Sequence, residues 1–251
     1  MTIAAATILL ANLLVSNVTW TGNPYSGSLL NGYYYTLDLW NLGSASGTIW
    51  ISVYRDNIFE IHSNLRNVKF KDPSLGIIGY PDAIYGHSIW YNITTNSNYP
   101  LRLLNAPRIV IDVAYLPLMD RCPTDVALDV WLTKNKEYKI RPGDVELMIW
   151  LYRKDLVPRG HVFGYIHYKS VNWSVWIDQG EWSYIAFVPS KNISHIRINL
   201  NKFIKYLEKI DLINKYYWIN DIDFGVEFSK NKENSAPFDF ILYYYVNQTI
   251  K

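Results

Sequence analysis

In the segment 144–151 every second residue is aliphatic, and the residues between them are acidic, thioether or aromatic. Its odd positions are all Val, Leu or Ile, and its even positions are Asp144, Glu146, Met148 and Trp150. Because side chains along a strand point alternately to opposite faces, this pattern predicts a half-buried β-strand. One face of the predicted strand therefore carries a carboxylate beside a thioether and an indole.

Two further segments, 125–132 and 223–229, show the same alternation with an aliphatic or aromatic core face. Their opposite faces carry Asp125, Asp129 and Trp131 in the first segment, and Asp223, Gly225, Glu227 and Ser229 in the second. Acids next to large aromatic side chains on one sheet face are what a site that binds sugars and performs acid–base chemistry requires.

Strand-like runs separated by turn residues recur through the rest of the chain. They cover residues 32–40, 48–54, 108–115, 162–168, 174–177, 183–188 and 238–246. Only 199–213 has helical spacing of its apolar residues, with Asn199 as the expected N-cap. Many short strands and one late helix predict an all-β fold, a sandwich of two antiparallel sheets with one helix packed on the outside.

Composition narrows the class of protein. The chain has 251 residues, of which 49% are hydrophobic and 18% charged, so it can bury a large core and is not of the disordered type. Aromatic residues reach 16%, more than one core needs, which places some of them on the surface. The formal net charge is only +2, which does not indicate a nucleic-acid-binding surface, so nucleic acid is not expected as a partner.

The chain has one cysteine, Cys122, so stability must come from packing without an intrachain disulfide. A buried, inert thiol is the expected state of that residue. The five histidines are scattered, and the pair His161 and His167 is only a weak metal signal. We therefore expect neither a catalytic metal nor a cofactor.

Residues 3–15 are almost entirely apolar, which suits a signal-peptide core but is too short for a membrane span. We treat 1–16 as an apolar N-terminal segment, either a secretory remnant or anchor or the lead into a first strand, and 17–251 as a single domain. Five glycosylation sequons, at Asn17, Asn92, Asn172, Asn192 and Asn247, lean toward an exported, extracellular or cell-surface protein.

The sequence Glu146-Leu-Met-Ile-Trp150 closely resembles the nucleophile strand of glycoside hydrolase family 12, and the likeness extends in order from about residue 19 to residue 245. Segment 125–132 looks like the strand that precedes the nucleophile, 223–228 like the strand bearing the acid/base, 79–86 like a loop of archaeal and thermophilic members, and 36–41 like the early strand that supplies a tryptophan platform. The resemblance implies a β-jelly roll with a concave substrate cleft and endo-acting hydrolysis of β-1,4-glucans.

The resemblance also implies a retaining mechanism, which needs two carboxyl groups about 5–5.5 Å apart. Glu146 is the expected nucleophile and should have the lower pKa, and Glu227 is the expected general acid/base with a raised pKa. Asp129 is expected to donate or accept a hydrogen bond at Glu146 and so orient it; a solvated surface acid is the alternative for this residue. Asp144, which follows Pro142-Gly143, is expected to be a turn residue.

The predicted substrate contacts combine aromatic platforms with polar groups. They are Trp40, Asp38, Met148, Trp150, Trp131, Tyr80 and His87, with residues 158–160 in a loop that crosses the cleft. A place in the core is the alternative for any of the tryptophans, and Asp38 stands where the family often has Asn.

Three other classes of protein fit parts of the pattern. A non-catalytic carbohydrate-binding jelly roll would also display aromatic residues, a family 11 xylanase would also pair two glutamates, and a surface-layer β protein would explain the tyrosines and sequons. The preferred glucan is left open among cellulose, mixed-linkage β-glucan and xyloglucan. A monomer is the expected state, and the absence of disulfides with many Ile, Tyr and Lys residues is compatible with a thermophile.

Overall fold

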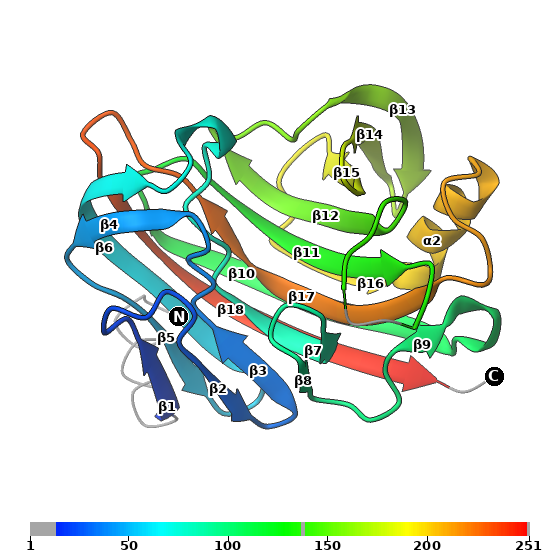
Figure 1. Ribbon diagram of the computed structural model, residues 1–251, viewed down its shortest axis with the longest axis horizontal. Coiled ribbons are helices and arrows are strands. Elements are labelled where there is room, and N and C mark those ends of the chain that lie inside the picture. Colours follow the sequence, from blue (N-terminus) through cyan, green and yellow to red (C-terminus); the bar gives the residue numbers. More distant parts are fainter. Residues whose placement is uncertain (1–13, 137–138, 250–251) are drawn as a thin grey trace.

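Two stacked β-sheets make up the computed structural model, which describes residues 14–136 and 139–249 (Figure 1). Within these residues the smaller sheet has seven strands, in the spatial order β1 (Leu14–Thr19), β5 (Ile49–Tyr54), β6 (Ile58–Phe70), β18 (Ala236–Thr249), β10 (Arg108–Asp120) and β16 (His195–Asn199), with β4 (Leu42–Ser46) paired to β6.

The larger sheet has eleven strands in the described part of the chain. Their order is β13 (His161–Tyr168), β14 (Val171–Gln179), β15 (Ser183–Pro189), β12 (Val145–Lys154), β11 (Thr124–Thr133), β17 (Trp218–Phe228), β7 (Asp82–Ser88), β3 (Tyr33–Thr36) and β2 (Gly27–Leu30), with β8 (Ile93–Thr94) beside β7 and β9 (Leu101–Arg102) beside β17. One α-helix, α2 (Leu200–Lys209), and two short 3₁₀ turns, η1 (Pro73–Leu75) and η2 (Leu103–Asn105), complete the described elements.

The predicted jelly-roll sandwich is confirmed, with one departure from the expected antiparallel pairing. β12 and β15 run parallel, with Glu146 opposite Tyr184 and Met148 opposite Ala186. A parallel pair needs a crossover connection, and here the chain between β12 and β15 forms the β13–β14 hairpin. This pairing brings residues just before β15 next to Glu146.

The alternation predicted for the acid-bearing strands is confirmed by burial. Val145, Leu147, Ile149 and Leu151 of β12 are fully buried in the core between the sheets, as are Phe224, Val226 and Phe228 of β17. Each such side chain stabilises the fold by about 1.5–3 kcal/mol relative to exposure. The acids on the same strands are therefore held on the face of the larger sheet that points away from this core.

The helix is shorter than the predicted 199–213. α2 ends at Lys209, and Asp211 adopts a left-handed backbone with φ +58, which ends helical geometry. Asn199 occupies the N-cap position, but its side chain makes no capping hydrogen bond. Phe203 packs its ring 4.9 Å from that of Phe187, so the helix closes one edge of the core.

The strand predicted at 32–40 also ends early. β3 stops at Thr36 because Asp38 has a positive φ of +37, yet Leu37 and Leu39 keep their expected buried positions.

Residues 1–13 of the apolar N-terminal segment lie outside the described residues, and Leu14–Thr19 form β1, paired antiparallel to β5. Within the described residues no helix has the length and apolar character needed to span a membrane.

Candidate active site

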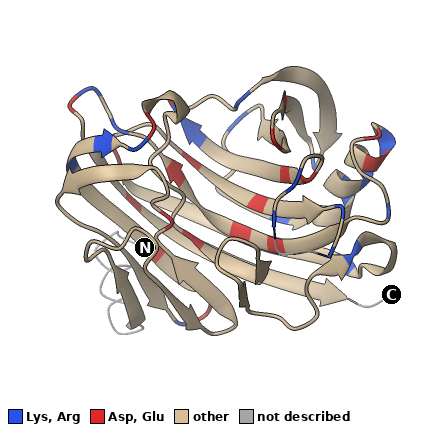
Figure 2. Cartoon of the chain, viewed as in Figure 1, with Lys and Arg blue, Asp and Glu red and all other residues tan. Residues whose placement is uncertain are grey.

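Eight carboxylic acids gather on the face of the larger sheet that points away from the core. We call this set the acid face; its members are Asp38, Asp82, Asp125, Asp129, Glu146, Asp221, Asp223 and Glu227. Figure 2 shows acidic residues lying in line across the middle strands β12, β11 and β17. Burial of so many acids away from water disfavours their charged forms, so this surface must serve something other than stability.

The central strand β11 sets the register of the acid face. Glu146 on β12 lies opposite Trp131, and Glu227 on β17 lies opposite Asp125. Asp129 lies between these two positions and faces Met148 on one side and Asp223 on the other. Glu146 and Glu227 thus come from the two strands that flank β11, at different heights along it.

Glu146 accepts a hydrogen bond of 2.6 Å from the indole N–H of Trp182. Burial raises the pKa of Glu146 to about 7, while the Trp182 hydrogen bond lowers it, the negative charge of Glu227 raises it and the positive charge of Arg159 lowers it. An indole N–H can only donate, so this contact favours the ionised carboxylate.

Glu227 has a different partner. Burial raises its pKa to about 7, and a hydrogen bond with Asp125 and the charge of Arg159 both lower it. Asp125 is fully buried and has no other hydrogen-bond partner among the described residues. Burial and the adjacent Glu227 charge hold the pKa of Asp125 well above its usual range, so Asp125 is the protonated neighbour that can donate a hydrogen bond to Glu227.

One detail of the predicted acid chemistry is corrected and one stays a prediction. Burial raises the pKa of both glutamates to about 7, so the expected lower pKa of Glu146 stays a prediction. The expected hydrogen bond from Asp129 to Glu146 is absent from the described structure, and one Asp129 carboxyl oxygen is buried without a partner. Burial first, and then the charge of Glu146, hold the pKa of Asp129 well above its usual range.

A cluster of three tryptophans borders Glu146. Trp131 contacts Trp90 and Trp182 edge to face, with ring centroids 5.3 and 5.6 Å apart. Trp131 is only 4% exposed, whereas Trp90 is 55% exposed and presents the accessible ring of the cluster. The sequence did not single out Trp90 or Trp182; the parallel β12–β15 pairing that brings Trp182 to Glu146 has no local signal.

Met148 and Trp150 lie on the predicted face but are not open to a ligand. Each is 2% exposed, and with Ala127, Tyr184, Ala186 and Val188 they form a second apolar cluster that Leu156 and Trp176 pack against. Their predicted role as an exposed sugar platform is therefore corrected to a buried layer beneath the site.

Asp38 belongs to the acid face, as expected, and accepts a hydrogen bond of 2.6 Å from Tyr91. Burial raises the pKa of Asp38 to about 6, and the Tyr91 hydrogen bond lowers it. Trp40 is half-buried beyond the end of β3, where its carbonyl accepts a hydrogen bond from Lys71. Its role as a platform stays a prediction.

Tyr80 and His87 are buried and already have protein partners. The Tyr80 hydroxyl donates to the Ala127 carbonyl over 2.8 Å, and Nδ1 of His87 lies 2.7 Å from the Thr94 hydroxyl. Both side chains are therefore held by protein contacts, and their role in substrate binding stays a prediction. Arg159, from the loop predicted to cross the site, is 59% exposed and pairs with Asp178 at 2.9 Å.

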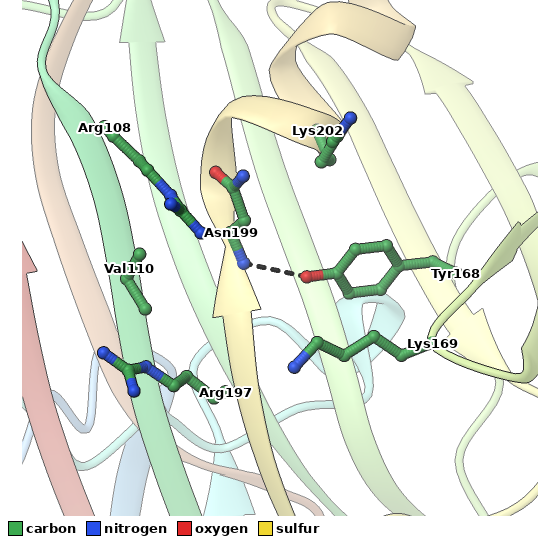
Figure 3. Close-up of a pocket in the computed structure, with 7 residues that line it drawn as sticks. All are labelled: Arg108, Val110, Tyr168, Lys169, Arg197, Asn199 and Lys202. Atoms are coloured by element: carbon green, nitrogen blue, oxygen red, sulfur yellow. Dashed lines mark hydrogen bonds between the residues drawn. The ribbon is translucent and has the colours of Figure 1, made fainter. Parts of the chain in front are cut away.

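Other candidate sites lack the chemistry of the acid face. A hollow of about 200 Å³ between β10, β16 and the start of α2 is lined by Arg108, Val110, Tyr168, Lys169, Arg197, Asn199 and Lys202 (Figure 3). Its charged side chains are all basic, so it has no proton donor of suitable pKa for glycoside cleavage. Cys122 is buried as expected, and burial raises the pKa of its thiol, which leaves it unreactive.

Comparison with known proteins identifies the family of the chain. The family model described as Glycosyl hydrolase family 12 matches residues 31–243, which is most of the chain. No curated protein matches the sequence.

Solved structures share the fold at low sequence identity. Endoglucanase cel12A from Rhodothermus marinus aligns with a TM-score of 0.77 and 18% identity over 94% of this chain and 99% of its own. A metagenome-derived glycoside hydrolase family 12 endoglucanase aligns with a TM-score of 0.78 and 19% identity, over 94% and 98%. The native family 12 xyloglucanase from Bacillus licheniformis aligns with a TM-score of 0.75 and 19% identity, over 93% and 100%. From the family match and the fold together, the chain belongs to glycosyl hydrolase family 12 and is a glycoside hydrolase.

Proposed function

We propose that this protein hydrolyses internal β-1,4-glucosidic bonds of glucan chains with retention of configuration, using Glu146 as nucleophile and Glu227 as general acid/base. The observation that carries the proposal is the difference between their partners. Glu146 receives a hydrogen bond from an indole, and Glu227 lies beside a carboxyl group of raised pKa. Two carboxyl groups in such different surroundings can divide the roles of nucleophile and acid.

The ionised role suits Glu146. A nucleophile must carry its negative charge when it attacks the anomeric carbon, and the Trp182 N–H stabilises that form more than the neutral acid. The Glu227–Asp125 pair keeps a proton near the glycosidic oxygen, as the leaving group requires.

The reaction then follows two displacements. Glu146 attacks the anomeric carbon while Glu227 gives its proton to the departing sugar oxygen, which forms a covalent glycosyl-enzyme ester. Glu146 is then part of an uncharged ester, and Glu227, left as a carboxylate by the first step, accepts a proton from the incoming water. Water attacks the same carbon, releases Glu146 and restores both starting forms.

The remaining acid-face residues suit sugar binding. Sugar rings pack their C–H faces on aromatic side chains, and the exposed Trp90 ring stands next to Trp131 and Trp182 at this position. Asp38 and its Tyr91 partner offer an acceptor and a hydroxyl for hydrogen bonds to sugar hydroxyls. The solved structures of similar fold include both an endoglucanase and a xyloglucanase, so a branched glucan is a substrate to test beside linear ones. Because polymeric glucan cannot cross a membrane, we place the activity outside the cell.

The decisive experiment measures reducing-sugar release from carboxymethylcellulose, mixed-linkage β-glucan, xyloglucan and xylan. Wild type should cleave at least one β-glucan, and Glu146→Gln should lose activity by about 10⁴-fold or more while remaining folded. Glu181→Gln, which neutralises an exposed acid next to Trp182, is the matched control and should retain activity. Nuclear magnetic resonance of the first products should show the β-anomer. Folded wild type that binds glucan without releasing sugar would favour a binding module, and preferential cleavage of xylan would favour a xylanase.

A further inference from the structure

A second group of polar side chains lies on the smaller sheet, on the face that points away from the core. Glu60 and His62 are two residues apart on β6 and share that face, and Asp239 on β18 is the direct cross-strand partner of His62. Potential ligand atoms of these three residues all lie within 4.8 Å of one another. The cluster is separated from the acid face by the core between the sheets.

Each member of the cluster is held in place by neighbours. Nδ1 of His62 lies 3.1 Å from Asp239 Oδ2, and the imidazole is stacked on Trp50 at a ring-centroid distance of 3.9 Å. The Tyr54 hydroxyl donates to Glu60 Oε2 over 2.8 Å. These contacts fix the imidazole ring and one carboxyl oxygen of each acid.

The cluster has more negative charge than its partners neutralise. Asp239 Oδ1 is buried and has no hydrogen-bond partner, and no lysine or arginine of the described residues forms an ion pair with either carboxylate. The two carboxylates and the histidine are all half-buried. A bound cation would stabilise the negative charge of such carboxylates.

We propose that Glu60, His62 and Asp239 form a binding site for a divalent transition-metal ion, with Zn²⁺ as the reference ion. One imidazole nitrogen and two carboxylates are a ligand set that Zn²⁺ accepts, with water in the fourth position. Mg²⁺ and Ca²⁺ prefer oxygen ligands to an imidazole nitrogen, so these ions should bind to the site more weakly than Zn²⁺.

Uptake of the ion has a definite proton balance. The nitrogen of His62 that binds must be unprotonated, so when Nδ1 of a neutral imidazole takes the ion the ring keeps its one proton on Nε2, and no net proton is released. The ion would link β6 to β18, residues that are 177 positions apart along the chain. Because such an ion binds the folded chain and not the unfolded one, it should raise the melting temperature in proportion to the logarithm of its concentration.

The same sheet contains a matched control. His195 Nε2 lies 2.9 Å from Asp112 Oδ1, so it forms a histidine–aspartate pair on the same face, but the described residues supply no third ligand there. A histidine–aspartate pair alone should not hold a metal ion tightly, so this pair separates the effect of the third ligand from that of a pair.

The test is isothermal titration of the full, untagged chain with ZnCl₂ at pH 7 after dialysis against a chelator. One ion should bind per chain. Glu60→Gln, His62→Gln and Asp239→Asn should each weaken binding at least about tenfold and abolish the rise in melting temperature. His195→Gln should bind as wild type does, and all four variants should keep wild-type glucan hydrolysis.

Two results would overturn the proposal. The first is the absence of saturable Zn²⁺ binding to wild type up to about 1 mM, which is decided without any variant. The second is binding that survives in His62→Gln and Asp239→Asn, which would place the ion elsewhere, for example among the buried acids of the other sheet.

Discussion

Trp182 and Glu146 are joined by a hydrogen bond of 2.6 Å from the indole N–H to Glu146 Oε2, although they lie 36 residues apart. Trp182 directly precedes β15, which runs parallel to β12, and Tyr184 two residues later lies opposite Glu146. A residue outside the predicted acid strands thus controls the ionisation of the proposed nucleophile.

Replacing Trp182 by Phe should shift the pH dependence of the enzyme. Without the N–H donor the ionised form of Glu146 is less stable, so its pKa should rise above about 7. The acid limb of kcat/KM should move to higher pH, with a loss of about tenfold at pH 6 for a shift of one unit and recovery at higher pH. Trp90→Phe is the control, because Trp90 contacts the same cluster without touching Glu146. An unshifted profile in Trp182→Phe would separate this hydrogen bond from catalysis.

Replacing Glu227 by Gln should affect substrates according to their leaving group. A natural glucan needs a proton on its departing oxygen, so its hydrolysis should fall by about 10²–10⁴-fold. A dinitrophenyl β-cellobioside leaves without a proton, so the burst of dinitrophenol that reports glycosylation should change far less. Azide, which needs no base, should then release the trapped intermediate as a β-glycosyl azide. Equal losses on both substrates, without azide rescue, would assign Glu227 a structural role.

The parts of this structure that follow from local pattern could be predicted from the sequence. Alternation placed the acids of β11, β12 and β17 on one face because burial of the opposite aliphatic row fixes which side each strand shows. Asp144 is likewise a turn residue, as expected, and accepts hydrogen bonds from the backbone N–H groups of Lys134 and Arg141.

What could not be predicted depends on contacts between distant segments. Alternation gives the face of Met148 and Trp150 but not whether Trp176 covers that face. The contact between Asp125 and Glu227 could not be predicted either, because it depends on the register between two strands about 100 residues apart in the sequence. Strand β3 ends early because Asp38 has a positive φ, and the pattern of apolar residues carries no signal for that backbone conformation.

Removing Asp125 should move the alkaline limb of the pH profile. The hydrogen bond from Asp125 lowers the pKa of Glu227, so Asp125→Ala should raise that pKa above about 7 and keep the proposed acid protonated to higher pH. Asp125→Asn keeps an N–H donor at the same place and should shift the limb less. The measurement is kcat/KM from pH 4 to 9 on one soluble glucan. A shift of the limb to lower pH in Asp125→Ala would contradict the assignment of Asp125 as the donor.

The buried acids should make the protein more stable at acidic than at neutral pH. Burial holds the pKa values of Asp82, Asp125, Asp129, Asp221 and Asp223 well above their usual range. The unfolded chain loses these protons near pH 4, whereas the folded chain retains them to higher pH. Their stabilising effect is therefore complete below about pH 4 and is lost as pH rises through the folded pKa values, by up to about 1.4 kcal/mol per pH unit for each retained proton.

Urea unfolding at pH 4.5, 6 and 7.5 measures this slope directly. Asp223→Asn should reduce it, because the amide cannot ionise in either state and so removes one proton from the difference between folded and unfolded chains. Asp72→Asn is the matched control: Asp72 is exposed and its pKa is lowered by Ser74, so its own effect is constant above pH 5 and the slope should not change. A free energy of unfolding that increases from pH 4.5 to 7.5 would mean that the acid face is ionised in the folded protein, which would require bound cations to balance its charge.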